Sequence, residues 1–234
     1  LFSDMGKYSK AEPLFLEAMA IREKLLGKEH ADYASSLNNL GELYFYIGEF
    51  EKSEACFAEL FKISQSFIIK ALYYLSEEEI SLYLNNFTEY QNRIFTFVSR
   101  FSGNQNVSEQ VCYNSCLFYK GFLLNAANRI KTLALCDTTA TEKFNKLKSY
   151  KYRLAAEYSK PILDRKHVPE LERKSNELEK DLVRTINGYG QAIQQINWQD
   201  VQQMLKSNEV AIEFVDYKYW LKVKSDSIMY GALI

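Results

Sequence analysis

Residues 6–15, GKYSKAEPLF, and residues 48–57, GEFEKSEACF, carry the same pattern and decide the fold of the first part of the chain. The second stretch follows the first at an offset of 42 residues, since 48 − 6 = 42. Self-similarity at a fixed spacing is typical of proteins built from stacked copies of one structural unit. We therefore expect a repeat architecture. At this offset Lys10 aligns with Lys52, Glu12 with Glu54, Phe15 with Phe57, Glu17 with Glu59, and Ile21 with Ile63.

The second copy indicates what the repeating unit is. Small or apolar residues fall on one side of a helix before Gly48, and again on one side of a helix after it. The first set is Leu37, Leu40, Gly41 and Tyr44, and the second is Ser53, Phe57 and Leu60. The glycine is placed where two helices cross closely, and the aromatic residues fill the groove between them. Residues 1–66 therefore resemble tetratricopeptide repeats, which are pairs of packed helices.

The length of the unit is similar to that of the kinesin-light-chain variety of this repeat. The ordinary repeat has about 34 residues, whereas the offset here is 42. The loop typical of that variety is visible as residues 21–30, IREKLLGKEH, followed by residues 36–40, SLNNL. One departure is Ala31, because that variety usually has proline after the histidine.

The resemblance implies a protein or peptide partner on the concave face of the repeats. The alternative is that Asn38 bonds only within the array and that Phe45 packs on the neighbouring helix. Many partners bind this fold, so the resemblance leaves the ligand unidentified. The positions from which such repeats usually contact peptides correspond to Ser35, Asn38, Glu42, Phe45 and Tyr46.

The composition argues against nucleic-acid and membrane partners. The formal net charge of the 234 residues is −1, and the basic residues around 143–153 are diluted by acidic ones. The longest apolar stretch, residues 117–127, is interrupted by Lys120 and Asn125 and is too short to span a bilayer. This stretch therefore leads us to expect a soluble protein. Only three prolines and nine glycines are present, which favours a mostly helical chain.

The cysteines and histidines do not form a catalytic or metal site. Four cysteines in a chain of this length do not make a disulfide framework, and reduced cysteines fit a cytoplasmic protein. Cys112 and Cys116 are four residues apart and could share a metal, but no histidine is near, and buried free thiols are the favoured interpretation. His30 lies in the loop between repeats and His167 lies beside a helix start. We expect no catalytic residues, no metal and no cofactor.

The rest of the chain divides into a helical connector, residues 67–205, and a segment with two strands, residues 206–234. Capping boxes at residues 76–79 and 139–142 predict two helix starts, the first helix running to about residue 101. Further helices are expected over residues 107–135, from Val168-Pro169 to Asn187-Gly188, and from residue 198. Alternating residues predict strands at 209–217 and 227–234. The predicted fold class is mostly α, with tetratricopeptide repeats, a helical connector and two C-terminal β-strands.

The final residues resemble the beginning of a CHAT domain, a caspase-like cysteine protease domain that commonly follows tetratricopeptide arrays in bacterial proteins. The similar segments are residues 198–202, WQDVQ, residues 211–214, AIEF, and residues 230–234, YGALI. Residues 75–79, LSEEE, and residues 118–129 are similar to the helical linker of such proteins. The histidine and cysteine of that family would lie beyond these strands. We therefore expect a fragment that lacks earlier repeats and stops inside the protease domain.

Two functions are expected from these resemblances. The first is a bacterial, cytoplasmic region that binds a protein partner and transmits binding to a CHAT protease, without catalysis of its own. The alternative is a scaffold or adaptor of tetratricopeptide type that holds a peptide and has no connection to a protease.

Overall fold

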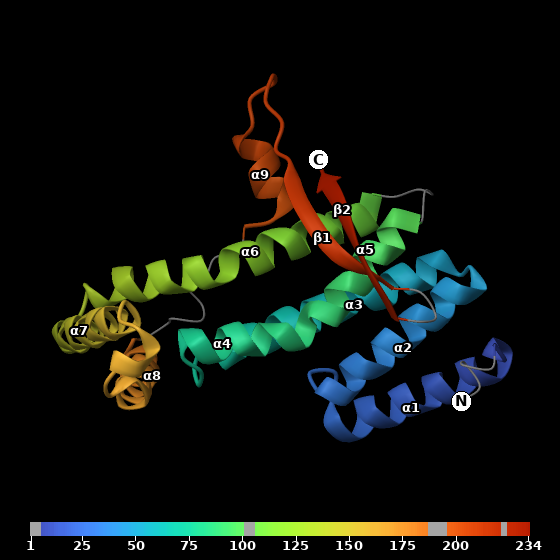
Figure 1. Ribbon diagram of the computed structural model, residues 1–234. Helices are drawn as coiled ribbons and strands as arrows, with labels where there is room; N and C mark the ends of the chain where they lie inside the picture. Colours follow the sequence, from blue (N-terminus) through green and yellow to red (C-terminus); the bar gives the residue numbers. More distant parts are fainter. Residues whose placement is uncertain (1–5, 101–105, 187–195, 221–223) are drawn as a thin grey trace. The chain divides into compact units, whose positions relative to one another are not determined.

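A computed structural model describes residues 6–100, 106–186, 196–220 and 224–234 (Figure 1). Within these ranges the chain is mostly helical and carries one antiparallel pair of strands, so the predicted fold class is confirmed. The predicted helix end at Asn187-Gly188 lies outside the described residues. In chain order the elements are α1 (Tyr8–Leu26), α2 (Ala31–Ile47), α3 (Phe50–Ala71), α4 (Glu77–Leu84), η1 (Asn85–Phe87), α5 (Thr88–Arg100), α6 (Asn106–Ala134), α7 (Thr138–Tyr158), η2 (Ile162–Asp164), α8 (Val168–Thr185), α9 (Trp198–Met204), β1 (Glu213–Trp220) and β2 (Lys224–Leu233).

The chain forms two compact units. The first comprises residues 1–67, 86–119 and 196–234, and the second comprises residues 68–85 and 120–195. Helices α3 and α6 contribute residues to both units. This division describes which residues are in contact, and the segment boundaries drawn from the sequence, 1–66, 67–205 and 206–234, stay predictions.

The repeat pattern corresponds to helices α1, α2 and α3 of the first unit. Gly6 and Gly48, which align in the two copies, both have positive φ angles, +70° and +83°, that disfavour any other residue. Gly41 lies where α2 and α3 pack, because a Cβ added to it would be 2.9 Å from Cε1 of Phe57. Ser53 Oγ donates to the carbonyl oxygen of Gly41 across the same contact, at 2.7 Å. The core between α1 and α2 is formed by Ala11, Leu40, Leu43 and Tyr44.

The first unit continues with α5 and with the hairpin of β1 and β2. Phe97 of α5 packs on Phe57 of α3, with ring centroids 5.7 Å apart. Strand β1 contacts α5 and pairs with β2 from Glu213 opposite Leu233 to Lys218 opposite Ile228 (Figure 1). Both predicted strands are therefore present, displaced by a few residues from the predicted bounds.

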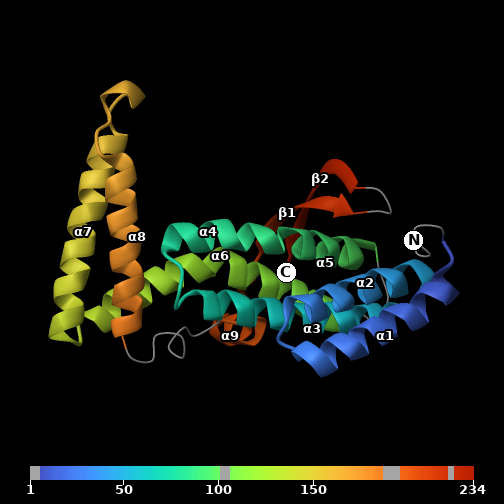
Figure 2. The same cartoon turned by 90° about the horizontal axis from the view of Figure 1, so that it is seen from below.

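The second unit is built around α7 and α8, which lie side by side as a helical hairpin (Figure 2). Along α8, Leu171, Ser175 and Leu182 are buried, and so is the charged residue Glu179. Helix α4 begins with the predicted capping box, in which Glu79 N donates to Ser76 Oγ and Ser76 N to Glu79 Oε2.

Two helix boundaries differ from the sequence prediction. The helix predicted for residues 76–101 is interrupted by the 3-10 turn η1, where two adjacent asparagines, Asn85 and Asn86, favour local bonding over a continuous helix. Helix α7 is capped by Asp137, whose side chain accepts from Ala140 N at 2.7 Å, so Thr139 is inside the helix and does not cap it.

Candidate protein-binding surface of the repeat

All five predicted peptide-contact residues lie on α2. Ser35 is half-buried, and its hydroxyl donates to the carbonyl oxygen of Ala31 at 3.0 Å. The side chain of Asn38 is more strongly enclosed, with 5% of the residue exposed. Its Oδ1 atom is buried and accepts no hydrogen bond within the described residues. A buried acceptor without a donor destabilises a fold by about 1–3 kcal/mol.

The other three residues contact neighbouring helices of the same unit. Glu42 forms an ion pair with Arg93 of α5, and burial lowers the pKa of Arg93 to about 10, which leaves it charged at neutral pH. Phe45 packs edge-on against Phe97 with ring centroids 5.7 Å apart. Tyr46 stacks on Tyr8 of α1 at 6.1 Å. The structure thus places α5 against the C-terminal half of the predicted face, and leaves Ser35 and Asn38 outside that contact.

Helix α5 contacts the extended strand β1 of the hairpin. Asn92 of α5 is buried, and its Oδ1 accepts the backbone N–H of Lys218 on β1 at 3.0 Å. Tyr217, the residue before Lys218 in β1, packs its ring on that of Phe95 of α5, with centroids 5.6 Å apart. The unit therefore already binds an extended main chain through a buried asparagine. Sequence reasoning missed Asn92, and the available signal was a polar residue among apolar ones on the face of α5.

A cleft of about 720 Å³ lies beside α9 in the first unit. Its size is within the range of about 300–1,000 Å³ that ligand pockets usually have. Helix α9 is fixed at its start, because Trp198 N donates to Asn114 Oδ1 at 2.8 Å and Asn197 and Asp200 form a capping box. The lining is mainly apolar, and sequence reasoning did not predict it. The apolar and aromatic residues are Val98, Tyr113, Trp198, Val201, Leu205, Val210, Ala211, Ala232, Leu233 and Ile234, and the polar ones are Glu109, Gln110, Gln202 and Glu209.

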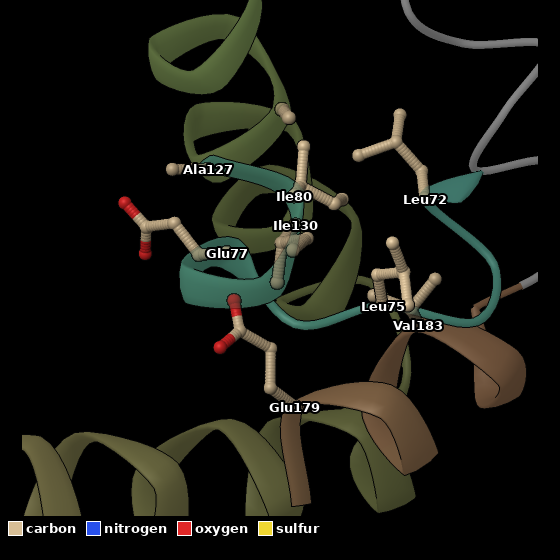
Figure 3. Close-up of a pocket in the computed structure, with 9 residues that line it drawn as sticks. Leu72, Leu75, Glu77, Ile80, Ala127, Ile130, Glu179 and Val183 are labelled. Atoms are coloured by element: carbon tan, nitrogen blue, oxygen red, sulfur yellow. The ribbon is translucent and has the colours of Figure 1, made fainter. Parts of the chain in front are cut away.

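A buried carboxylate in the second unit is the remaining candidate for chemistry. Glu179 of α8 reaches toward the first turn of α4, where Glu77 lies (Figure 3). Lys151 of α7 stands between them, with its Nζ atom 2.8 Å from Glu77 Oε2 and 3.5 Å from Glu179 Oε2. Burial raises the pKa of Glu179, Glu77 raises it further, and Lys151 opposes both effects.

The space at Glu179 is too small for a substrate. The adjoining cavity has a volume of about 20 Å³, which is about the size of one water molecule, and most of its walls are apolar side chains such as Leu72, Leu75 and Ile80. The carboxylate is held by Lys151. We therefore interpret this cluster as a structural contact between α4, α7 and α8.

The histidines and cysteines have local roles in the structure. His30 caps α2, since its Nδ1 accepts from Asp32 N at 3.1 Å, while His167 lies exposed before α8 with φ of +59°. Burial raises the pKa of the Cys112 thiol, so that thiol is not an activated nucleophile. In the described ranges no three potential metal-ligating His, Cys, Asp or Glu side chains cluster together. Those ranges also contain no helix that is both long and apolar enough to cross a membrane.

The paired helices of the first unit begin with a repeat region. Residues 1–66 match the tetratricopeptide repeat family. The chain therefore contains tetratricopeptide repeats, which generally mediate interactions between proteins. A search of curated proteins found no match, and neither did a search of solved structures.

Proposed function

We propose that the chain is the partner-binding region of a bacterial, cytoplasmic CHAT protease and has no catalytic activity of its own. The proposal that the chain binds a partner rests on one observation: Asn92 of α5 accepts a hydrogen bond from the main chain of strand β1. The same chemistry on α2 would let Asn38 receive a backbone N–H from an extended peptide. The free cysteines support a reducing compartment.

The proposed peptide site is the N-terminal half of the α2 face, around Ser35 and Asn38. The half formed by Glu42 and Phe45 is in contact with α5, so a peptide would extend from that contact toward Ser35. The buried Oδ1 of Asn38 would accept the peptide main chain, which fixes an extended backbone and selects little for sequence. Specificity would then come from the side chains that flank this hydrogen bond.

The peptide site is tested by a pair of neighbouring asparagines. A displayed library of random ten-residue peptides is selected on the chain, and the affinity of the best binder is measured by calorimetry. Asn38→Ala should weaken it about 5- to 10-fold, the effect of one lost hydrogen bond. Asn39→Ala is the matched control, because Asn39 is exposed on the same helix. Equal affinities of both variants and the parent would remove Asn38 from the site.

The protease part rests on the order of the elements in the chain. Tetratricopeptide repeats come first, helices follow, and then α9 and a hairpin occupy the residues that resemble the start of a CHAT domain. The test is the natural coding sequence beyond Ile234. A histidine–glycine motif followed by a strand-borne cysteine supports the protease, and replacing that cysteine should abolish proteolysis. A stop codon or unrelated repeats would leave the scaffold function alone.

A further inference from the structure

The near-zero net charge of the chain conceals opposite charges on its two compact units. The second unit contains 16 Lys and Arg residues and 12 Asp and Glu residues, which gives it a formal charge of +4. The first unit contains 13 and 18 of these residues, which gives it a formal charge of −5. A basic surface on one unit can attract an anionic partner even when the charge of the whole chain is balanced.

The basic excess of the second unit is concentrated on α7, which lies beside α8 (Figure 2). Residues 143–156 include five basic residues and no acidic one. Two of the five are paired: Lys143 Nζ is 2.8 Å from a carboxylate oxygen of α8, and Lys151 Nζ is 2.8 Å from one of α4. The other three are exposed, and within the described residues none of them has an ion-pair partner. They are Lys146, Lys148 and Arg153.

The acidic residues near α7 leave these three cations uncompensated, because most of them bond to other groups. Between residues 138 and 185, six of the eight acidic side chains contact a basic or a hydroxyl group. The pairs are Glu157 with Lys160, Glu170 with Lys174, Glu172 with Tyr158, Glu177 with Arg173, Glu179 with Lys151, and Asp181 with Lys143. The remaining two acidic residues lie at either end of the basic stretch, Glu142 near the start of α7 and Asp164 beyond its end.

Two tyrosines alternate with the uncompensated cations. Tyr152 is 65% exposed, and Lys148 Nζ lies 5.6 Å from the centre of its ring. The Arg153 guanidinium carbon lies 5.8 Å from the centre of the Tyr150 ring. An α-helix turns by about 100° per residue, so residues 146, 150 and 153 share one edge of the exposed face of α7, and residues 148 and 152 share the other.

We call the exposed face between these two edges the α7 strip. Residues 143–156 of the helix are about 20 Å long at a rise of about 1.5 Å per residue. A partner that matches the strip has anionic groups for the cations and flat rings for the tyrosines. Single-stranded nucleic acid has both, since its phosphates repeat along the chain and its unpaired bases can stack on aromatic side chains. An acidic peptide would match only the charge.

We propose that the α7 strip binds single-stranded nucleic acid, with phosphates at Lys146, Lys148 and Arg153 and a base stacked on Tyr152. Contacts to phosphates and ring faces carry little sequence information, so the binding is tolerant of sequence. Three phosphate contacts make it weak and dependent on salt. The composition of the whole chain disfavours such a partner because it averages this strip with the acidic first unit.

Fluorescence anisotropy of a labelled single-stranded oligothymidine, titrated with the full chain at several salt concentrations, tests the proposal. For single strands the logarithm of the binding constant falls with the logarithm of salt concentration by about 0.7 per phosphate contact, so three contacts predict a slope of about −2. Lys146→Ala and Arg153→Ala should each weaken binding about 2- to 10-fold and bring the slope to about −1.4. Tyr152→Ala should weaken binding about 5-fold or more and leave the slope unchanged, because stacking releases no counterions.

Lys174→Ala is the matched control, because Lys174 is a partly exposed lysine of α8 that pairs with Glu170 outside the strip, and its replacement should leave affinity and slope as in the parent. Circular dichroism verifies that each variant is folded. A parent chain that does not bind the oligothymidine at low salt would overturn the proposal. So would a Tyr152→Ala variant with parental affinity, or equal affinity for a DNA duplex of the same length. Displacement of the oligothymidine by a lower concentration of a polyglutamate peptide would assign the strip to acidic proteins instead.

Discussion

Gly41 sets the distance between α2 and α3. A Cβ at this position would be 2.9 Å from Cε1, 3.1 Å from Cζ and 3.2 Å from Cδ1 of Phe57, all closer than ordinary contact. The Phe57 ring cannot easily move away, because it is buried and packs on Phe97. The small residue is therefore required by packing, whereas its backbone is helical and has no need of glycine.

Replacing Gly41 by alanine should destabilise the chain by about 1 kcal/mol. Overpacking a filled core costs about 1–3 kcal/mol, and part of this is offset by the better helix propensity of alanine. The measurement is the midpoint of urea unfolding. Gly121→Ala is the matched control, since a Cβ there meets only the flexible Asn125 side chain at 3.3 Å and should gain up to about 1 kcal/mol. Equal midpoint changes in the two variants would show that Gly41 is not at a crossing point.

At the scale of elements, local signals in the sequence predicted helices and strands but not their long-range contacts. The capping box at Ser76 and the proline after Val168 identify helix starts because they act on adjacent backbone groups. The packing of β1 on α5 joins Asn92 to Lys218, which are 126 residues apart, and no periodic pattern reports such a pairing. Within the candidate site, the sequence indicated the α2 positions but not that α5 covers Glu42 and Phe45.

The burial of Glu179 shows a second limit of pattern reasoning. Helix α8 buries Leu171, Ser175 and Leu182, and it also buries a charged residue, because Glu179 beside Leu178 is only 4% exposed. Its place is explained only by residues from elsewhere: Lys151 of α7 and the backbone of Glu77 in α4 both interact with its carboxylate. A buried carboxylate needs such partners, and they cannot be identified from the sequence of α8 alone.

Replacing Lys151 by methionine should destabilise the contact among α4, α7 and α8 by about 1–3 kcal/mol at pH 7, because a buried carboxylate loses its partner. Burial raises the pKa of Glu179, so its charged form disfavours the fold. This penalty is present above the folded-state pKa and is lost as the pH falls through it toward the unfolded value. The deficit, measured by urea unfolding, should therefore shrink from pH 7 to pH 5.

The control for Lys151 is Lys146→Met, an exposed lysine on the same helix, which should change stability by less than about 0.5 kcal/mol at either pH. A Lys151→Met deficit that stays constant with pH would show that Glu179 does not carry the effect. The loss would then come from packing of the lysine stem.

At the scale of the whole molecule, two compact units share two helices. Residues of α3 and α6 belong to both units, so unfolding of one unit can either stop within these helices or pass through them. Unfolding of one unit spreads to the other through such a helix only if the backbone hydrogen bonds break along its full length. A helix can also lose hydrogen bonds at one end while the rest stays intact. We expect the two units to open separately.

Leu182→Ala, in the second unit, and Leu40→Ala, in the first unit, test whether each unit can be destabilised without the other. Leu182 of α8 and Leu40 of α2 are both almost fully buried, so each substitution should cost about 2–5 kcal/mol in its own unit. Hydrogen exchange followed by mass spectrometry should then show faster exchange in α7 and α8 for Leu182→Ala, with α1 and α2 unchanged. For Leu40→Ala the reverse should hold, because the core of Leu40 is made with Ala11, Leu43 and Tyr44 of the first unit. If either substitution accelerates exchange equally in all four helices, the chain opens as one cooperative unit, and the shared helices α3 and α6 carry that cooperativity.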